Sequence, residues 1–235
     1  MWGGVKGLGF TLAKRLLSLG AYVTITGRSE EKLIQTVETL DSNRVDFLQW
    51  DVCDFKSAGN KIKLLLSKHE YIDGFINNAG VYFSEDSKFI GQSENNWNLT
   101  MDTNLKGLHY LCQNEIDYFL KCGGGKIINI TSLGGVRAGY TPYDLSKSGA
   151  NTLTRALAKK YTSRQIIINA IAPGEMPTDM GTLCDIHDNL YYGRQRNQRL
   201  TLTEEVAELT AFLLSDSTNN LCGQILCCDG GASLF

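Results

Sequence analysis

Short apolar runs alternate with longer amphipathic stretches from one end of the chain to the other. Continuous runs of Val, Ile, Leu and aromatic residues are typical of strands that are buried on both faces of a parallel sheet. The predicted strands are 21–26, 45–50, 72–77, 126–131, 165–170 and 221–228. The predicted helices are 10–19, 30–40, 55–69 and 141–161.

The helix predicted over 141–161 carries the clearest signals. Ala150, Leu153 and Leu157 recur at spacings of three and four, which puts them on one apolar stripe. Thr141 is a suitable N-cap residue, and Pro142 suits the first helical position. The pattern therefore predicts a helix that begins at this Thr-Pro pair and buries one face.

Alternation of strands and helices without a break in composition predicts an α/β protein. We expect a single Rossmann-type doubly wound parallel sheet with helices on both faces, in three layers, over one domain of residues 1–235. The glycine cluster that should follow a first strand begins already at Gly3. A central strand without its partner leaves buried backbone groups unpaired, so we expect about seven to ten preceding residues in the complete protein. A short start whose gap is filled by other residues is the alternative.

Composition and charge narrow the classes of partner. The 235 residues carry a formal charge of −2, which gives no electrostatic reason to bind nucleic acid or an anionic membrane. No apolar run reaches the roughly 18 residues of a membrane span, and no signal peptide is evident. The seven cysteines are irregularly spaced, which favours reduced thiols and a cytoplasmic location. The three histidines fit no metal-ligand spacing, so we predict no metal site.

A glycine-rich turn comes first among the candidate motifs. Gly3, Gly7 and Gly9 precede the first predicted helix, and such a turn lets the backbone approach a pyrophosphate at the helix N-terminus. The next strand ends at Arg28, where NAD-binding proteins usually carry an acidic residue for the ribose. Arg28, with Lys6 from the glycine turn, could hold the 2′-phosphate of NADP. Two solvated surface cations are the alternative.

Further polar groups follow the next strands. Asp51, followed by Val52, ends one strand and could accept a hydrogen bond from an adenine amino group. Asn77-Asn78-Ala79-Gly80 ends another. The segment 173–178 follows the fifth predicted strand, and its Thr178 could bind the carboxamide of a nicotinamide.

Tyr143 and Lys147 carry the strongest chemical signal. Four residues apart on a helix, their side chains lie on one face. A neighbouring ammonium lowers the pKa of a phenol, which makes tyrosine usable as an acid or base. Ser132 could hydrogen-bond the oxygen that gains or loses the proton, and Asn104 precedes it in a helical stretch.

This ordered set of motifs resembles the short-chain dehydrogenase/reductase family, in its subgroup of about 250 residues, over the whole chain. The resemblance implies that Tyr143 is the general acid/base, that Ser132 polarises the substrate oxygen and that Lys147 lowers the tyrosine pKa and holds the nicotinamide ribose. It also implies that Asn104 distorts its helix and seats a water molecule. The implied cofactor site comprises Gly3, Lys6, Gly7, Leu8, Gly9, Arg28, Asp51, Val52, Asn78, Ala79, Gly80, Tyr143, Lys147, Pro173, Gly174, Met176 and Thr178.

Three departures from the family pattern stand out. Trp2 replaces the threonine before the glycines, and its ring either crowds the adenosine side or plugs the core. Ser132 and Tyr143 are only eleven residues apart, which requires a tight loop through Gly134, Gly135 and Gly139. Pro177 is expected to stiffen the segment that covers the cofactor.

The resemblance implies NADP(H)-dependent transfer of a hydride between nicotinamide and a carbonyl or secondary alcohol, of 3-oxoacyl, sugar/polyol or steroid-like type. A catalytically inactive nucleotide-binding protein is the main alternative, and a sugar-nucleotide epimerase or dehydratase is disfavoured by the short chain. Substrate choice is assigned to a loop at about 180–202, whose Tyr191, Tyr192, Arg194, Arg196 and Arg199 either grip an anionic or aromatic substrate or form a solvated lid. Relatives are usually homotetramers or homodimers built through two long helices, here near 97–120 and 142–161.

Overall fold

The computed structural model describes residues 1–178 and 190–234 and contains one parallel sheet in two parts. The strands are β1 (Val23–Gly27), β2 (Val45–Gln49), β3 (Gly74–Asn77), β4 (Gly125–Ile130), β5 (Ile166–Pro173) and β6 (Ile225–Cys228). β1 pairs with β2, while β3, β4, β5 and β6 are neighbours in that order, and every pair is parallel. Trp2 forms parallel bridges to Thr26 and Asn77 and so joins the two parts between β1 and β3.

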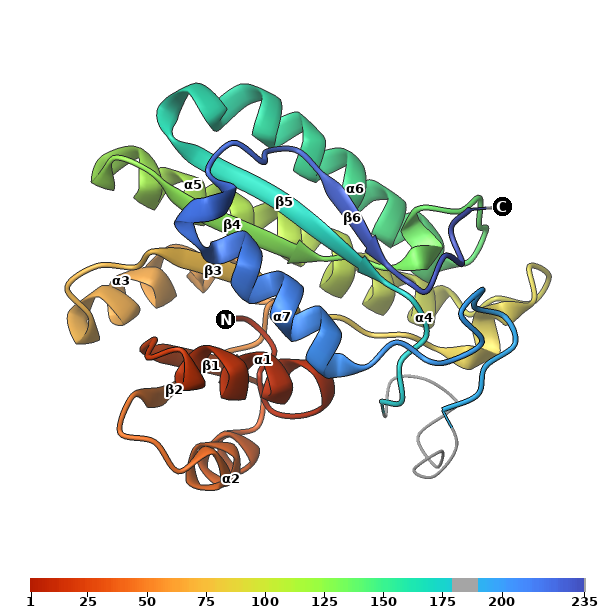
Figure 1. Ribbon diagram of the computed structural model, residues 1–235, viewed down its shortest axis with the longest axis horizontal. Coiled ribbons are helices and arrows are strands. Elements are labelled where there is room, and N and C mark those ends of the chain that lie inside the picture. The colour runs from red at the N-terminus through yellow and green to blue at the C-terminus, as the bar shows by residue number, and fades with distance from the viewer. Residues whose placement is uncertain (179–189, 235) are drawn as a thin grey trace.

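Helices cover both faces of this sheet (Figure 1). They are α1 (Gly7–Ser18), α2 (Glu30–Leu40), α3 (Ala58–Lys68), α4 (Glu94–Met101), α5 (Leu108–Cys122), α6 (Pro142–Tyr161) and α7 (Thr203–Leu214). α1 and α7 pack against each other, while α5 and α6 pack on the strands from the other side (Figure 1). Among the described residues, no helix combines the length and the apolar character that a membrane crossing needs.

The predicted fold class, a doubly wound α/β sheet in three layers, is confirmed. The predicted strands and helices are present, with three local differences. A 3₁₀ turn at Phe55–Ser57 precedes α3, and only the second half of the stretch 221–228 is a strand. α7 was not predicted. Thr141 caps α6 as expected, because its hydroxyl accepts from the Asp144 backbone N–H at 3.1 Å and the Asp144 carboxylate accepts from the Thr141 N–H at 3.3 Å.

Backbone hydrogen bonds from residues 1–4 replace part of a central strand. The Trp2 N–H donates to Ile76 O at 2.9 Å, and the Thr26 N–H donates to Met1 O at 3.1 Å. The Asn78 N–H donates to Trp2 O at 3.1 Å. These bonds satisfy the carboxyl-terminal halves of β1 and β3, next to the glycine turn. That a longer first strand precedes Gly3 in the complete protein stays a prediction.

Trp2 plugs the core. Its side chain is 1% exposed, and its ring lies 5.0 Å from that of Trp50 and 6.2 Å from that of Phe75, measured between ring centroids. Its Nε1–H donates to Glu115 Oε1 at 2.6 Å. Of the two interpretations of this departure from the family pattern, the structure therefore supports the one in which the ring fills the interior.

We expect Trp2→Ala to lower the free energy of unfolding by about 3–5 kcal/mol, the usual loss for a buried large aromatic side chain. The variant loses two ring contacts and leaves a buried glutamate without one donor. Urea unfolding followed by tryptophan fluorescence and circular dichroism measures the difference. Trp97→Ala is the matched control, because Trp97 is 38% exposed and its loss should change the stability by less than about 1 kcal/mol. Equal losses in the two variants would contradict the role given to Trp2.

Candidate active site

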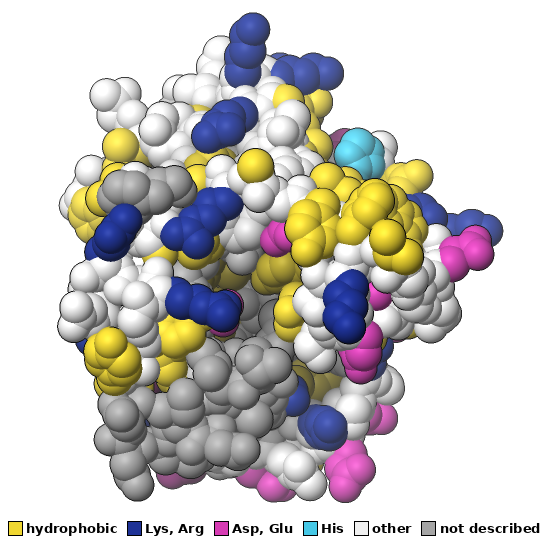
Figure 2. All heavy atoms as spheres, turned by 90° about the vertical axis from the view of Figure 1, so that its right-hand side faces the viewer, with side chains coloured by type: hydrophobic (Ala, Val, Ile, Leu, Met, Phe, Trp, Pro, Cys, Tyr) yellow, Lys and Arg dark blue, Asp and Glu magenta, His cyan; other side chains and the backbone are white. Residues whose placement is uncertain are grey.

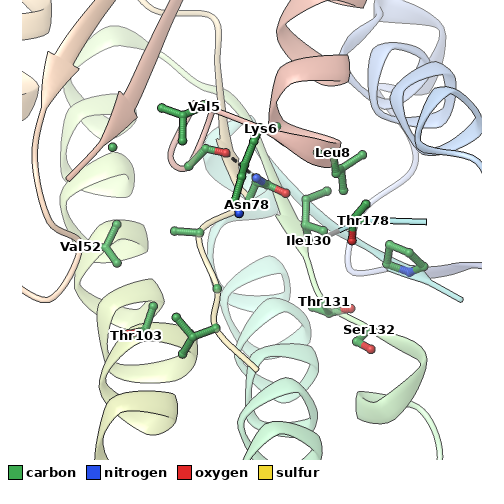
Figure 3. A pocket seen from close by; sticks show the side chains of 18 of the residues that line it. Val5, Lys6, Leu8, Val52, Asn78, Thr103, Ile130, Thr131, Ser132 and Thr178 are labelled. Carbon is green, nitrogen blue, oxygen red and sulfur yellow. Dashed lines mark hydrogen bonds between the residues drawn. The ribbon is translucent and has the colours of Figure 1, made fainter. Parts of the chain in front are cut away.

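A cleft of about 310 Å³ opens where the carboxyl ends of the strands meet. Open α/β sheets bind ligands at this edge because the connecting loops diverge there. Every residue that the sequence assigns to the cofactor site lines the cleft, from Gly3 in the first turn to Thr178 after β5 (Figure 3). Ser132 lines it as well, beside Thr131 (Figure 3). Segments as distant as the glycine turn and α6 thus face one space.

The glycine turn fits a phosphate group at the start of α1. Gly7 has φ +53°, which favours glycine, and a Cβ at Gly9 would lie only 2.1 Å from Gly3 O. The Asn78 side chain fixes the turn, because its Nδ2 donates to Gly3 O at 2.6 Å. Lys6 is the N-cap residue of α1, and its side chain does not cap the helix. The first N–H groups of α1 are therefore presented to the cleft as an anion site.

Arg28 and Lys6 line the end of the cleft next to β1. Gly27 lets Val5 pack closely against the end of β1, since a Cβ there would approach Val5 Cγ1 to 3.1 Å. The Arg28 backbone is anchored, because its carbonyl accepts from Gln49 Nε2 at 2.9 Å. Two cationic side chains at this position fit a 2′-phosphate on an adenosine ribose.

Asp51 and Val52 line the same end after β2. Asp51 Oδ1 accepts from the Cys53 N–H at 2.9 Å, so one carboxylate oxygen shapes the turn. The Cys53 side chain is a second neighbour of this carboxylate, which is the type of group that can accept from an adenine amino group. Trp50, which is 4% exposed, and Thr103 also line the cleft, and sequence reasoning missed both.

Tyr143 and Lys147 lie on one face of α6, as the spacing predicts. Lys147 Nζ lies 5.6 Å from the centroid of the Tyr143 ring and donates to Ile130 O at 3.0 Å. The Tyr143 hydroxyl is hydrogen-bonded to Ser132, whose Oγ also accepts from the Gly134 N–H at 3.1 Å. Three of the four predicted catalytic side chains, those of Ser132, Tyr143 and Lys147, therefore meet at the wall of the cofactor cleft.

Burial shifts the pKa values of Tyr143 and Lys147 in opposite directions. It raises the pKa of Tyr143 to about 12, although the hydrogen bond to Ser132 acts in the lowering direction. It lowers the pKa of Lys147 to about 8. The sequence predicts that a neighbouring ammonium lowers the pKa of Tyr143. This prediction is wrong when only the protein's own groups act on the phenol. The reason is that the ammonium is directed at Ile130 O rather than at the phenol oxygen, so desolvation prevails.

The short loop between Ser132 and Tyr143 closes as the glycine pattern requires. A 3₁₀ turn at Leu133–Gly135 begins it. A Cβ at Gly135 would lie 2.6 Å from the backbone carbon of Lys147, and one at Gly139 would lie 2.4 Å from Asp144 Cγ. Only glycine therefore lets this loop pack directly on α6.

Asn104 lies behind the cleft rather than in it. It belongs to a π-helical segment, Asp102–Gly107, between α4 and α5, so the helix is distorted at this residue as the resemblance implies. Its Oδ1 accepts from the Val81 N–H at 2.8 Å, and its Nδ2 donates to Val81 O at 2.9 Å and to Ser146 Oγ at 3.2 Å. Asn104 thus ties the segment after β3 to α6.

Aromatic side chains form one ring pair with Tyr143 and another between exposed loops. The Tyr82 ring lies 5.2 Å from that of Tyr143, and the exposed Phe89 and Tyr140 rings are 5.9 Å apart. Figure 2 shows Lys and Arg side chains around a hollow in this face, with apolar side chains gathered beside it. Sequence reasoning missed this apolar wall, because its residues come from separate loops.

The predicted substrate loop at about 180–202 lies partly outside the described residues, which resume at 190. Arg199 is one of the residues that either grip a substrate or form a solvated lid, and its guanidinium pairs with both Glu205 oxygens, at 2.9 and 2.5 Å. Arg194 lies close enough to lower the pKa of Glu175, a carboxyl whose pKa burial raises. Glu175 in turn raises the pKa of Tyr143. Sequence reasoning missed Glu175, although it stands inside the predicted segment 173–178.

Known proteins resemble this chain in sequence and in fold. A family model described as enoyl-(acyl carrier protein) reductase matches residues 3–233. The chain is 33% identical to 3-oxoacyl-[acyl-carrier-protein] reductase FabG of Chlamydia trachomatis serovar D, over 97% of this chain and 94% of the relative. A structure of ElxO with NADP bound superimposes with a TM-score of 0.90 at 28% identity, covering 99% of this chain and 97% of that one. An actinorhodin polyketide ketoreductase with NADPH also reaches 0.90, at 26% identity, over 100% of this chain and 96% of that one.

Proposed function

Because the chain belongs to the short-chain dehydrogenase/reductase family of NAD(P)-dependent oxidoreductases, we propose that it is an NADPH-dependent reductase of carbonyl compounds. One observation carries the proposal. The hydrogen-bonded Ser132–Tyr143 pair and Lys147 line the same cleft as the glycine turn of α1. An acid/base group and a dinucleotide site within one cleft are what hydride transfer to a carbonyl requires.

In this proposal, different residues of the cleft bind different parts of the cofactor. The turn from Gly3 to Gly9 takes the pyrophosphate, and Asp51 with Val52 takes the adenine. Lys147 holds the nicotinamide ribose, and Thr178 faces the nicotinamide carboxamide. When bound, the reduced nicotinamide supplies the hydride. The remaining lining residues of the proposed site are Lys6, Leu8, Arg28, Asn78, Ala79, Gly80, Pro173, Gly174 and Met176.

Side chains of the protein then supply the proton that the reduction requires. The Tyr143 hydroxyl donates its proton to the substrate oxygen as the carbonyl carbon is reduced, and the Ser132 hydroxyl donates a hydrogen bond to that oxygen. Because burial raises the pKa of Tyr143 to about 12, the phenol keeps its proton near neutral pH and is ready to act as the acid. This protonation state favours reduction over alcohol oxidation in the physiological pH range.

A 3-oxoacyl compound is the substrate that we propose first. The name of the Chlamydia relative describes reduction of such a substrate, and an actinorhodin ketoreductase also acts on a ketone. The exposed Phe89, Ile90 and Tyr140 offer apolar surface to a flexible acyl chain. Sugar/polyol and steroid-like carbonyls remain the other members of the proposed class.

Turnover with a panel of carbonyls tests the proposal. We expect the chain to oxidise NADPH with a 3-oxoacyl thioester and to be slower with sugar or steroid ketones. A folded chain that binds NADPH and oxidises it with none of them would favour the inactive nucleotide-binding alternative. The hydrogen bond between Ser132 and Tyr143 favours the hypothesis that the chain is an active reductase.

We expect Arg28→Ala to raise the Kd for NADPH about 10- to 100-fold and to change the Kd for NADH by less than about twofold. Loss of a charge-assisted hydrogen bond typically weakens binding by about 1.5–3 kcal/mol, and only NADPH carries the 2′-phosphate. Titration of the intrinsic nicotinamide fluorescence measures both constants. Lys14→Ala, which removes an exposed cation outside the lining of the cleft, is the control. An equal loss of affinity for both nucleotides would contradict the assignment of Arg28.

Location and assembly are part of the same proposal. The six cysteines within the described residues are all free thiols, which supports a reducing, cytoplasmic environment. Trp97, Tyr110 and Leu145 expose apolar surface on α4, α5 and α6, the helices through which we expect a homotetramer or homodimer to form. Small-molecule substrates, rather than nucleic acid or membrane, are the proposed partners.

A further inference from the structure

Glu115 is a buried carboxyl group that the proposed reaction does not use. It lies on α5, is 0% exposed and does not line the cofactor cleft. Each of its oxygens accepts one N–H, Oε1 from Trp2 Nε1 at 2.6 Å and Oε2 from Asn77 Nδ2 at 3.1 Å. Because a carboxylate accepts at both oxygens, this pattern of hydrogen bonds is that of the ionised group.

Both donors stand one residue before the cleft. Trp2 directly precedes Gly3 of the glycine turn, which lines the cleft. Asn77 directly precedes Asn78, which also lines it. Asn78 Nδ2 donates to Gly3 O at 2.6 Å, and the Asn78 N–H donates to Trp2 O at 3.1 Å. The Glu115 carboxyl group therefore holds, from behind, the two segments that shape the glycine turn.

Protonation of Glu115 disrupts this arrangement. A neutral carboxyl group carries a hydrogen on one oxygen, and either oxygen already faces an N–H donor. One of the two bonds, from Trp2 or from Asn77, is then weakened or lost. The backbone of Trp2 is hydrogen-bonded to Ile76 and Asn78, so a displacement of its side chain also displaces the start of the glycine turn.

The ionised and neutral forms of Glu115 are close in free energy at neutral pH. Burial raises the pKa of Glu115 to about 7, and the bonds from Trp2 and Asn77 oppose that rise. Changes of pH around neutrality therefore change the fraction of chains in which this carboxyl group is ionised.

The groups that surround Glu115 titrate differently. Cys112, on the same helix, stays a neutral thiol because burial raises its pKa well above its ordinary value. The Met1 ammonium acts on Glu115, and burial lowers the pKa of that ammonium to about 6. β3 and β4 present the amides of Asn77 and Asn129, and the side chains of α3 and β5 in the adjoining core are apolar. Loss of the Met1 charge as the pH rises weakens the binding of an anion, which is opposite in sign to the effect argued for Glu115.

We propose that Glu115 is a pH-sensitive switch for dinucleotide binding. The carboxylate holds Trp2 and Asn77, and with them the glycine turn, in the shape that binds the pyrophosphate, whereas the neutral carboxyl group releases one of them. Glu115 does not line the cleft, so it acts through these bonds rather than by its charge. The inference rests on the proposed dinucleotide site. Because binding selects the ionised form, a proton leaves Glu115 for the solvent as the dinucleotide binds.

The Kd for NADH, followed by nicotinamide fluorescence from about pH 6 to about pH 8, tests the switch in the full chain. NADH is the probe because it lacks the 2′-phosphate, and a phosphate monoester itself titrates near about pH 6. We expect the Kd to fall about tenfold over this range, the change for one ionisation near pH 7 that binding requires. A Kd that changed by less than about twofold would overturn the switch.

Calorimetry of the parent protein tests the same inference without any variant. Titration with NADH in two buffers of different ionisation enthalpy should show the release of about half a proton per NADH bound near pH 7. No proton release would refute the switch even if a Glu115 variant failed to fold. Absence of NADH and NADPH binding at every pH would instead refute the proposed dinucleotide site itself, so the two failures are distinct.

Two variants give a readout that a purely structural role would not move. Glu115→Gln does not titrate, and a glutamine offers one acceptor and one donor, as the neutral carboxyl group does. Its Kd for NADH should stay near the parent value at about pH 6 over the whole range. Trp2→Phe removes one donor and keeps a ring in the core, so the midpoint of the Kd profile should move up by about one to two pH units, the size of one hydrogen bond to a charged group.

Asp117→Asn is the matched control, because Asp117 is an exposed carboxylate on the same helix that pairs with Lys121. This variant should keep the parent profile of Kd against pH. If Glu115→Gln kept the parent profile as well, Glu115 would have a structural role only and the switch would be refuted.

Discussion

Tyr143→Phe is expected to lower kcat with NADPH and a carbonyl substrate by about 10³-fold or more, near the upper part of the range for general acid catalysis. The change removes one oxygen atom, which is the proton donor in the proposed reaction. The aromatic ring at position 143 keeps its neighbours. Its centroid lies 5.2 Å from that of the Tyr82 ring and 5.6 Å from Lys147 Nζ, so the wall of the cleft keeps its shape. The Kd for NADPH should change by less than about threefold, well under one kcal/mol.

Single-turnover kinetics and fluorescence titration measure the two effects separately. Tyr140→Phe is the matched control, because its hydroxyl donates to Ser87 O at 2.8 Å on the exposed side of the same loop. This variant should keep more than half of the parent activity. A Tyr143→Phe protein that still turned over at a tenth of the parent rate would rule out the phenol as the acid.

Lys147→Met is expected to have opposite effects on activity and stability. Turnover should fall by about 10²-fold or more, because the ammonium proposed to hold the nicotinamide ribose is lost. Stability should increase. Burial lowers the pKa of Lys147 from 10.5 to about 8, and this difference corresponds to about 3 kcal/mol at a pH below both values. Loss of the bond to Ile130 O offsets about 1 kcal/mol of that gain.

The lowered pKa of Lys147 also determines how the stability difference between the parent and Lys147→Met changes with pH. The folded chain holds the Lys147 proton less tightly than the unfolded chain, so between about pH 8 and 10.5 the unfolded state binds more protons. The contribution of Lys147 to stability therefore becomes less unfavourable as the pH rises through this range. Parent and Lys147→Met should differ by about 2 kcal/mol in urea unfolding at pH 7 and converge or cross toward pH 10.

Lys159→Met is the control for the lysine variant, since Lys159 is exposed on the same helix. It should change neither the activity nor the unfolding free energy measurably. If Lys147→Met were less stable than the parent at pH 7, the buried ammonium would not destabilise the folded chain, contrary to its lowered pKa. Retained activity would instead remove Lys147 from the reaction.

Most of the cleft could be predicted because its residues stand where strands end. Asp51, Asn78 and Pro173 each follow an apolar run, and parallel strands bring their carboxyl ends to one edge. The Tyr143–Lys147 face and the Thr141 cap depend on helix periodicity, which is local. Patterns of this kind are set by neighbours within a few residues, so a single sequence contains them.

Contacts between distant segments could not be predicted in this way. Trp2 meets Glu115 across 113 residues, and Asn77 meets Glu115 across 38. The pairing of Arg199 with Glu205 engages a cation for which the sequence leaves two roles open, substrate binding or a solvated lid. In each case the pattern contains both residues but no signal that they touch.

The sequence by itself determined the order of strands and helices, the glycine turn and the side chains that face the cleft, because periodicity and spacing act over a few residues. Only the tertiary structure decided which groups are charged and which are paired. The phenol of Tyr143 is held neutral, and Lys147 and Glu115 are shifted toward neutrality, because packing removes water from all three. Desolvation depends on everything that surrounds a group in space, and the chain brings those surroundings together only when it folds.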